Sequence, residues 1–310
     1  AREIFYEHHV FESFPSVVDF ATENNPYYAI IMMDGDDMGK WINGDDGKIL
    51  DGFDKVDERY HKEFSRRLTV FSKEKVPTIV GDKSNENGPP KKGKLVYAGG
   101  DDVLAFMKLK DLLPTVKQLR STFSSDEVLG KKATVSMGIV IAHKKEPLQL
   151  VIQTVQQMEA TAKRYRNERQ EKDAVSIALL THSGYKRMLT IPWYLDEKKE
   201  QSTIDLLQDL IDALGDNLSS TFLHHFNEAF QPLVHDGQKP PIERAMIESE
   251  LRRLMKRAMK KKFDMEPLIE KLVQLYDLTN TFTEYIHLLE TARFISLRLK
   301  EQEPIKEGLD

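Results

Sequence analysis

The stretches AIIMMDGDDMG (residues 29–39) and YAGGDDVLAF (residues 97–106) decide the fold of this chain. In the first, a continuous apolar run meets an acidic turn, which is typical of a buried strand that ends at the surface. In the second, Gly-Gly-Asp-Asp separates two strand-like runs, and this composition predicts a β-hairpin with the four residues at its tip. The sequence therefore predicts two acidic turns at strand ends.

The segments around these strands complete a βαββαβ order. Apolar residues recur at helical spacing over residues 54–75 and 112–123, and residues 133–142 form an apolar run rich in β-branched side chains. This order predicts an α+β fold of the ferredoxin-like type, in which both helices cover one face of an antiparallel sheet. A further helix is expected over 148–169 and a further strand over 174–180.

The sequence changes character along the chain, and we expect three parts. Residues 1–26 form a lead-in segment, residues 27–195 the α+β domain, and residues 196–310 an all-α bundle of about four helices. Breaks between these helices are expected near 237–241 and 264–267, where Gly, Pro and Asp interrupt the apolar periodicity.

The composition excludes several kinds of site. The 310 residues include 45 basic and 50 acidic side chains, so a net charge of -5 gives no global attraction to nucleic acid or membrane. The absence of cysteine excludes disulfides, thiolate zinc sites and a cysteine nucleophile. No apolar run approaches the ~18 residues of a membrane span, so we expect a soluble, cytoplasmic protein. Because the chain begins with Ala1, we also expect a segment of a longer protein.

The two acidic turns together indicate a metal site. In a βαββαβ sheet the first strand and the hairpin are neighbours, so Asp34 is expected to face Asp101 and Asp102. Carboxylates brought together repel one another unless a cation joins them, and oxygen-only ligands favour Mg²⁺ or Mn²⁺ over zinc. Two such ions about 3.5–4 Å apart activate a 3'-hydroxyl and neutralise a triphosphate. We therefore predict that the three aspartates are catalytic residues and metal ligands.

The residues beside these acids favour close contact with a nucleotide. Gly35, Gly99 and Gly100 have no side chain, so the backbone there can approach phosphates or a ribose. Taken alone, Gly-Gly-Asp-Asp is also an ordinary hairpin turn, and its pairing with Asp-Gly-Asp-Asp is what favours a binding site. We assign the three glycines, together with Asp36 and Asp37, to cofactor contacts.

These motifs resemble a known family. The two opening stretches, the strand SMGIVIAH (136–143) and the segment MEATAKRYRNERQEKDAVSI (158–177) look like the second palm domain of the large subunit of type III CRISPR effector complexes. The resemblance covers about residues 27–183, and the helical remainder is similar to the C-terminal bundle of that subunit. It implies a palm of the nucleotidyl cyclase and polymerase type, with ATP as substrate and two Mg²⁺ or Mn²⁺ ions.

The resemblance also implies an activity and individual roles. ATP would be polymerised into cyclic oligoadenylates when the complex binds target RNA. Asp34 and Asp101 would be the principal metal ligands with Asp102 assisting, and Lys163, within the pair Ala162-Lys163, would hold phosphates. In the family two palms face each other, and the first palm is missing from this chain. We therefore expect the chain to need a partner palm for efficient turnover.

The helical part predicts contacts with other molecules. The segment ELRRLMKRAMKKKF (250–263) places apolar residues on one face of a helix and basic residues on the other, including Arg253, Lys256, Arg257 and Lys260. This basic face is either a solvated surface or a contact for RNA phosphates or acidic subunits. The expected partners are other type III effector subunits, with guide RNA and target RNA reached through the complex.

Three functions remain open at this point. The first is metal-dependent synthesis of cyclic oligoadenylates, the second is a non-catalytic ATP-binding scaffold within the effector, and the third is a stand-alone cyclic-dinucleotide synthase. The third is disfavoured because Asp102 stands where such enzymes usually have glutamate. Product analysis separates the first from the third, and turnover separates both from the scaffold.

Overall fold

A computed structural model of the chain describes residues 14–23, 25–81, 91–167, 170–181, 184, 186–234 and 242–301. The chain divides into two compact units, the first comprising Ala1–Arg166 with Gln170–Lys186 and the second Asn167–Arg169 with Arg187–Asp310. The first unit thus ends before residue 195, where the sequence predicts the domain boundary. Much of the predicted lead-in segment, and the predicted break near 237–241, lie outside the described residues.

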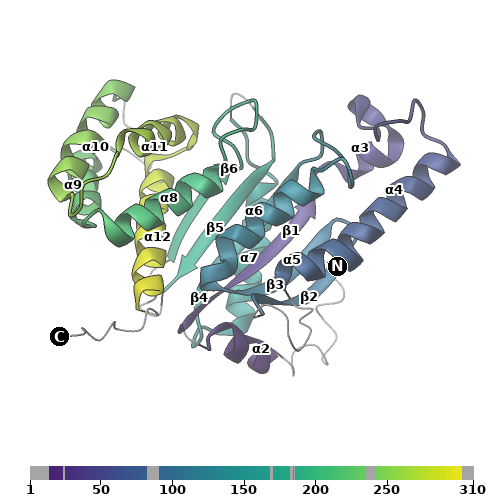
Figure 1. The fold of residues 1–310 in the computed structure, drawn as a ribbon, viewed down its shortest axis with the longest axis horizontal. Helices are drawn as coiled ribbons and strands as arrows, with labels where there is room; N and C mark the ends of the chain where they lie inside the picture. The colour runs from purple at the N-terminus through teal and green to yellow at the C-terminus, as the bar shows by residue number, and fades with distance from the viewer. Residues whose placement is uncertain are drawn as a thin grey trace. The chain divides into compact units, whose positions relative to one another are not determined.

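A mixed sheet forms the centre of the first unit (Figure 1). Its strands in this unit are β1 (Tyr27–Gly35), β2 (Gly93–Gly99), β3 (Asp102–Lys108), β4 (Val135–His143) and β5 (Ala174–Leu180). Within this unit they follow the order β2-β3-β1-β4-β5, and neighbours are antiparallel except β4 and β5, which are parallel. The first four strands have the ferredoxin-like order, so the predicted α+β fold is confirmed.

The central strand β1 is apolar on both faces until its last residues. Ala29, Ile30 and Ile31 are completely buried. Pairing with β3 ends at Met33, whereas pairing with β4 continues through Gly35. The acidic turn therefore begins where the sheet opens beside the hairpin.

Helices cover both faces of this sheet. The first unit contains α2 (Phe14–Ala21), α3 (Met38–Asn43), α4 (Glu58–Val70), α5 (Val76–Val80), α6 (Leu112–Phe123) and α7 (Leu148–Ala162). Figure 1 shows α4 and α6 on the near side of the sheet and α7 behind it. A π-helical turn, Phe71–Lys75, joins α4 to α5 just before Pro77, which has no N–H to donate.

Helix α7 ends earlier than the sequence predicts. We expected a helix over 148–169, but the regular helix ends at Ala162. The chain then turns back on itself, because the Lys172 N–H donates to the Tyr165 carbonyl oxygen at 2.8 Å and Arg166 forms a β-bridge with Glu171. This hairpin-like return brings the residues before β5 to the end of the sheet where the acidic turn lies.

Gly138 lets α7 lie directly against β4. A Cβ atom at Gly138 would be 2.4 Å from the Glu159 backbone nitrogen and 2.6 Å from the Val155 carbonyl oxygen. Because both obstructing atoms belong to the backbone, Gly138→Ala would force the helix away from the sheet. We expect the free energy of unfolding, measured by urea denaturation, to fall by up to about 3 kcal/mol.

Gly39, within α3, provides a matched control for this substitution. Nothing lies within 4 Å of the position that a Cβ atom would take there. Gly39→Ala is therefore expected to leave stability unchanged or to raise it by at most about 1 kcal/mol. Similar losses at both glycines would contradict the packing explanation.

The described part of the second unit consists mainly of helices, with one strand at its start. Its described elements include β6 (Lys186–Pro192), α8 (Thr203–Asp216), α9 (Thr221–Phe230), α10 (Arg244–Ala258), α11 (Glu266–Leu278) and α12 (Phe282–Lys300). The described part of this unit has five α-helices rather than about four, because a bend separates α8 from α9. Leu218 in that bend forms a β-bridge with Met259. Across the described ranges, we find no helix both long and apolar enough to cross a bilayer.

Candidate metal centre

The ends of β1 and of the β2–β3 hairpin bring three aspartates together. Gly99 pairs with Asp102 across the hairpin, and β3 pairs with β1 as far as Met33, so the hairpin tip lies beside the acidic turn. Carboxylate oxygens of Asp34, Asp101 and Asp102, one from each residue, lie within 4.8 Å of one another. The structure thus groups the three residues that the sequence singles out, and their role as metal ligands stays a prediction.

Glycines make this close approach possible. A Cβ atom at Gly35 would lie 2.9 Å from Asp101 Cβ and 2.9 Å from Phe123 Cζ, so the turn and the hairpin could not meet with a side chain there. Gly100, at the hairpin tip, has a φ of 64°, a left-handed conformation that favours glycine. Gly99 is the last residue of β2. Contacts of these three glycines with a nucleotide stay predictions.

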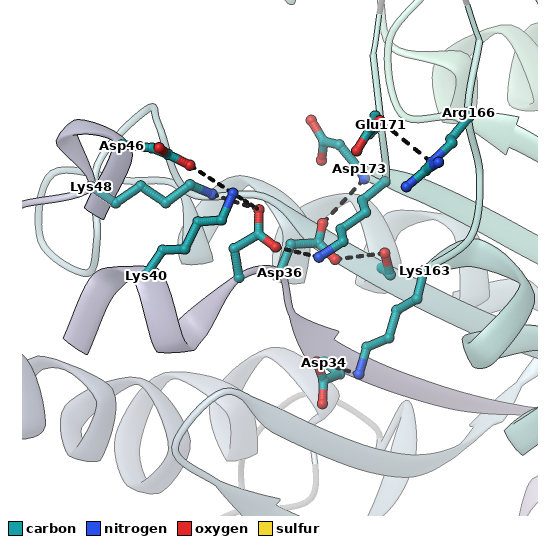
Figure 2. Close-up of polar contacts among 12 residues, drawn as sticks. Asp34, Asp36, Lys40, Asp46, Lys48, Lys163, Arg166, Glu171 and Asp173 are labelled. Carbon is teal, nitrogen blue, oxygen red and sulfur yellow. Dashed lines mark hydrogen bonds and ion pairs between the residues drawn. The ribbon is translucent and has the colours of Figure 1, made fainter. Parts of the chain in front are cut away.

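Lys163 reaches the acidic cluster from the end of α7 (Figure 2). Its Nζ lies 2.6 Å from Asp34 Oδ2 and 2.8 Å from Glu159 Oε1. Burial acts to lower the pKa of the Lys163 ammonium, but the two carboxylates outweigh burial and raise this pKa. A charged ammonium group therefore lies at the edge of the cluster, and its contact with phosphate stays a prediction.

The surroundings of this group hinder the ionisation of Asp101 and Asp102. Burial, and then the charge of Asp34, raises the pKa of Asp101. Burial, the hydrogen bond with Asp34 and the neighbouring charges raise the pKa of Asp102 to about 7. A divalent cation between these oxygens relieves such repulsion, and an all-carboxylate donor set suits Mg²⁺ or Mn²⁺. The residues present therefore fit the predicted metal.

The raised pKa of Asp102 predicts a pH dependence. An unfolded aspartate titrates near pH ~4, so in EDTA-treated protein the stability that Asp102 contributes is present below that pH and is lost as pH rises to about 7. A divalent cation competes with the same proton. We therefore expect Mn²⁺ affinity, measured by calorimetry, to increase by up to about tenfold per pH unit below pH ~7 and to level off above it.

Asp102→Asn is the control for this pH dependence, since it removes the titrating group. The variant should bind Mn²⁺ more weakly, and its affinity should change less between pH ~6 and ~8 than that of the parent chain. An unaltered pH profile in the variant would show that another group titrates.

The side chain of Asp36, in the acidic turn after β1, is buried. The residue is only 2% exposed, and its carboxylate accepts hydrogen bonds from Ser136 Oγ at 2.7 Å and from the Asp173 N–H at 3.1 Å. Asp173 in turn pairs with Arg120, whose Nε and Nη2 each lie 2.9 Å from an Asp173 oxygen. The Asp36 carboxylate is therefore hydrogen-bonded within the interior, and its contact with a cofactor stays a prediction.

Asp37 is engaged by lysine side chains. Its Oδ2 lies 3.1 Å from Lys48 Nζ and 4.0 Å from Lys40 Nζ, and its Oδ1 pairs with Lys172. Among the described residues, the group able to hold a metal comprises Asp34, Asp101 and Asp102 and leaves out Asp37. The metal cluster thus gives no support to the predicted cofactor contact of Asp37.

The residues that hold this acidic turn in place were not predicted from the sequence. Arg120 lies on the apolar face of the helix 112–123, and a charged residue on such a face indicates a buried ion pair. Asp173 directly precedes a fully buried strand, and Glu159 lies four residues before Lys163, the residue that caps the same helix. None of these signals identifies the partner by itself.

The basic helix in the second unit has the predicted two faces. The apolar side of α10 is buried, whereas Arg253, Lys256 and Arg257 are exposed, as is Lys260 just after the helix. Arg253 pairs with Glu250 on the same helix, which reduces the positive charge of this face. Contact of this face with RNA or with other subunits stays a prediction.

Comparison with known proteins connects this geometry to a family. The family model for the second palm domain of Cas10/Cmr2 matches residues 27–176. The chain is 30% identical over 240 residues to the CRISPR system Cmr subunit Cmr2 of Pyrococcus furiosus, with 69% of this chain and 26% of that protein aligned. The chain thus spans about a quarter of the length of this curated relative.

Solved structures share the fold at low identity. A cryo-electron microscopy structure of the type III-B Cmr-beta complex bound to cognate target RNA contains a chain with a TM-score of 0.54 and 15% identity, covering 88% of this chain and 39% of that chain. A crystal structure of a Csm1-Csm4 cassette in complex with cA4 gives a TM-score of 0.52 and 16% identity, covering 91% and 38%. These likenesses extend the shared fold beyond the residues that the family model matches.

Proposed function

Since residues 27–176 belong to the Cas10/Cmr2 second palm domain family, we propose that this chain is a metal-dependent nucleotidyl transferase palm of a type III effector complex. It binds ATP at the strand ends and converts it into cyclic oligoadenylate when the complex engages target RNA. The observation that carries this proposal is the group of Asp34, Asp101 and Asp102, whose oxygens lie within 4.8 Å of one another. Csm1-Csm4 cassettes solved with cA4 and with one ATP support the choice of nucleotide.

The residues of this proposed site have different roles. Asp34, Asp101 and Asp102 hold the divalent ions, which, when bound, activate a ribose 3'-hydroxyl and neutralise the triphosphate. Lys163 orients a phosphate group, and the Asp34 and Glu159 carboxylates keep its ammonium charged and aimed at the cluster. Without a side chain at Gly35, the acidic turn lies close enough to the hairpin tip for the three carboxylates to share the same ions.

The partners of the chain are part of the proposal. The chain spans 26% of the aligned Cmr2 protein, and Csm1 has been solved together with Csm4. We propose that this chain likewise works with other type III effector subunits, and that a second palm supplies the opposite half of the catalytic surface.

Product analysis tests the proposal. The chain is incubated with ATP and Mn²⁺, with and without a target-RNA-bound type III effector complex, and the products are identified by mass spectrometry. Cyclic oligoadenylate that disappears in an Asp101→Asn/Asp102→Asn variant supports the proposal. Metal-dependent ATP binding without product supports the scaffold function, and a cyclic dinucleotide supports the stand-alone synthase. If neither metal nor ATP binds, the proposed site is wrong.

A further inference from the structure

A second charged cluster lies beyond the acidic turn in the first unit. Three lysines surround the Asp37 carboxylate: Lys48 at 3.1 Å, Lys40 at 4.0 Å, and Lys172 in a direct ion pair. They come from three separate segments, namely α3, the turn after it, and the return that follows α7. Figure 2 shows Lys40 and Lys48 extending side by side toward the same place. We call these three residues the lysine cluster.

The lysine cluster has more positive charge than its acidic partners balance. Besides Asp37, it contacts Asp46, whose Oδ2 lies 2.7 Å from Lys40 Nζ. Three ammonium groups thus directly contact two carboxylates, and the charge of Glu171, which is itself paired with Arg166, also acts on Lys40. The Lys48 side chain is only 16% exposed and the Asp37 side chain 23%, so these charges are partly withdrawn from water and the interaction is stronger than at an open surface. The cluster can therefore accept further negative charge.

The backbone around this cluster is held in unusual conformations. Asp37, Asp46, Lys172 and Asp173 have φ angles of 56°, 53°, 59° and 48°, the left-handed region that non-glycine residues rarely adopt. Among the described residues, only Lys199 shares this property outside the cluster and its neighbours. Such conformations persist where the surroundings enforce them, and they gather at ligand sites.

A buried ion pair enforces the position of Lys172. Its neighbour Asp173 is 3% exposed, pairs with Arg120 through two hydrogen bonds of 2.9 Å, and donates its N–H to Asp36 at 3.1 Å. Asp36 is adjacent to Asp37, and Asp173 is adjacent to Lys172. The hydrogen bonds of Asp173 with Arg120 and Asp36 therefore hold both members of the Lys172–Asp37 pair in place. The lysine cluster is therefore preorganised rather than assembled from freely moving side chains.

The lysine cluster lies within reach of the acidic cluster. Asp34 and Asp37 are three residues apart, so their Cα atoms are at most about 11 Å from each other. A polyphosphate chain with one end at the divalent ions can extend over a distance of this order. Lysine ammonium groups bind phosphate as point charges with adaptable geometry, which suits terminal phosphates that must leave after reaction.

We propose that Lys40, Lys48 and Lys172 bind the terminal phosphates of the nucleoside triphosphate, and that Asp37 is an intramolecular anion that competes with them. The proposal rests on the proposed function for the nature of the substrate. It adds a binding site for polyphosphate. In this site Asp37 weakens nucleotide binding, whereas a metal ligand would strengthen it. The lysines bind either Asp37 or the phosphates. This competition limits the affinity of the chain for triphosphate and favours release of the pyrophosphate product.

Binding measurements on the full chain test this proposal with ATP, AMP and inorganic tripolyphosphate at one fixed Mg²⁺ concentration. Lys48→Met and Lys172→Met should each weaken ATP and tripolyphosphate about tenfold, since each removes a charge-assisted contact, and should change AMP by less than about twofold. Methionine retains the length and the backbone preferences of lysine. Lys62→Met, on the exposed face of α4, is the matched control and should change none of the three affinities.

The decisive variant is Asp37→Asn. Asparagine tolerates the left-handed conformation of Asp37, so the turn is retained while the competing charge is lost. ATP and tripolyphosphate should then bind several-fold more tightly, with Mn²⁺ affinity unchanged. Weaker Mn²⁺ and ATP binding in Asp37→Asn would overturn the proposal, because it would make Asp37 a metal ligand.

Two further outcomes separate this proposal from the proposed function. Unchanged tripolyphosphate affinity in folded Lys48→Met and Lys172→Met variants would overturn the lysine site while leaving product formation at the aspartates intact. Lys48→Arg, which restores the charge, should recover affinity if phosphate binding is responsible for the loss. Conversely, the chain could lack synthase activity while the lysine substitutions still weaken tripolyphosphate binding. That result would support the lysine site and reject the proposed function.

Discussion

Asp101→Asn is expected to reduce product formation more than about a hundredfold, since residues that only support metal ligands already affect activity by ~10- to 100-fold. Asparagine has the size of aspartate, so the packing of the hairpin tip against Gly35 is retained. What is lost is the negative charge beside Asp34, without which the remaining carboxylates bind a divalent ion poorly. Mn²⁺ titration followed by electron paramagnetic resonance should show the loss of metal binding directly, independent of turnover.

Asp45→Asn is the matched control for this experiment. Asp45 begins the short turn Asp45–Gly47 and accepts a hydrogen bond from Asn43 at 3.3 Å, but it does not belong to the group of residues able to hold a metal. Its substitution should leave metal binding and product formation unchanged. Equal losses at Asp45 and Asp101 would indicate a general electrostatic effect instead of a metal site.

Arg120→Met is expected to lower the free energy of unfolding by about 3–5 kcal/mol, the range found when one partner of a buried ion pair is removed. Arg120 is 2% exposed and Asp173 3%, and two hydrogen bonds join the guanidinium to the carboxylate. With methionine at 120, the buried Asp173 carboxylate loses both of these hydrogen bonds and the charge of the guanidinium. Urea denaturation measures the loss, and partial melting of the turn should also reduce ATP binding.

The double variant Arg120→Met/Asp173→Asn should recover part of this stability, because no buried charge is left unpaired and asparagine tolerates the backbone conformation of residue 173. The exposed ion pair of Lys62 with Glu58 supplies a surface comparison, and Lys62→Met should have no measurable effect on stability. A double variant less stable than Arg120→Met alone would contradict the account given for the ion pair.

Local patterns were enough to predict the fold of the first unit. The apolar run before Asp34 and the Gly-Gly-Asp-Asp turn each contain their own structural signal, and the βαββαβ order then determines which strands are neighbours. The meeting of Asp34, Asp101 and Asp102 followed from that order. Pairing across the sheet could be inferred because each of these residues lies at the end of a strand.

The ion pairs around the turn could not be predicted in this way. Arg120 and Asp173 are separated by 53 positions, and Asp37 and Lys172 by 135. No periodicity connects such residues, and the return after α7 that joins them was expected to be helix. Strand β6 was missed for a related reason, since its first residues are exposed and only its second half is apolar and buried.

The absence of a side chain at Gly35 links the evolution of the site to that of the core. The same position lies against Asp101, a proposed metal ligand, and against Phe123, a fully buried residue of α6 whose ring meets Phe71 edge to face. A change in the volume of either aromatic residue therefore alters the space in which the two acidic turns meet. Lineages that repack these aromatic residues should lose the activity before they lose the fold, and those that retain the activity should inherit Gly35 and both aromatic residues as one unit.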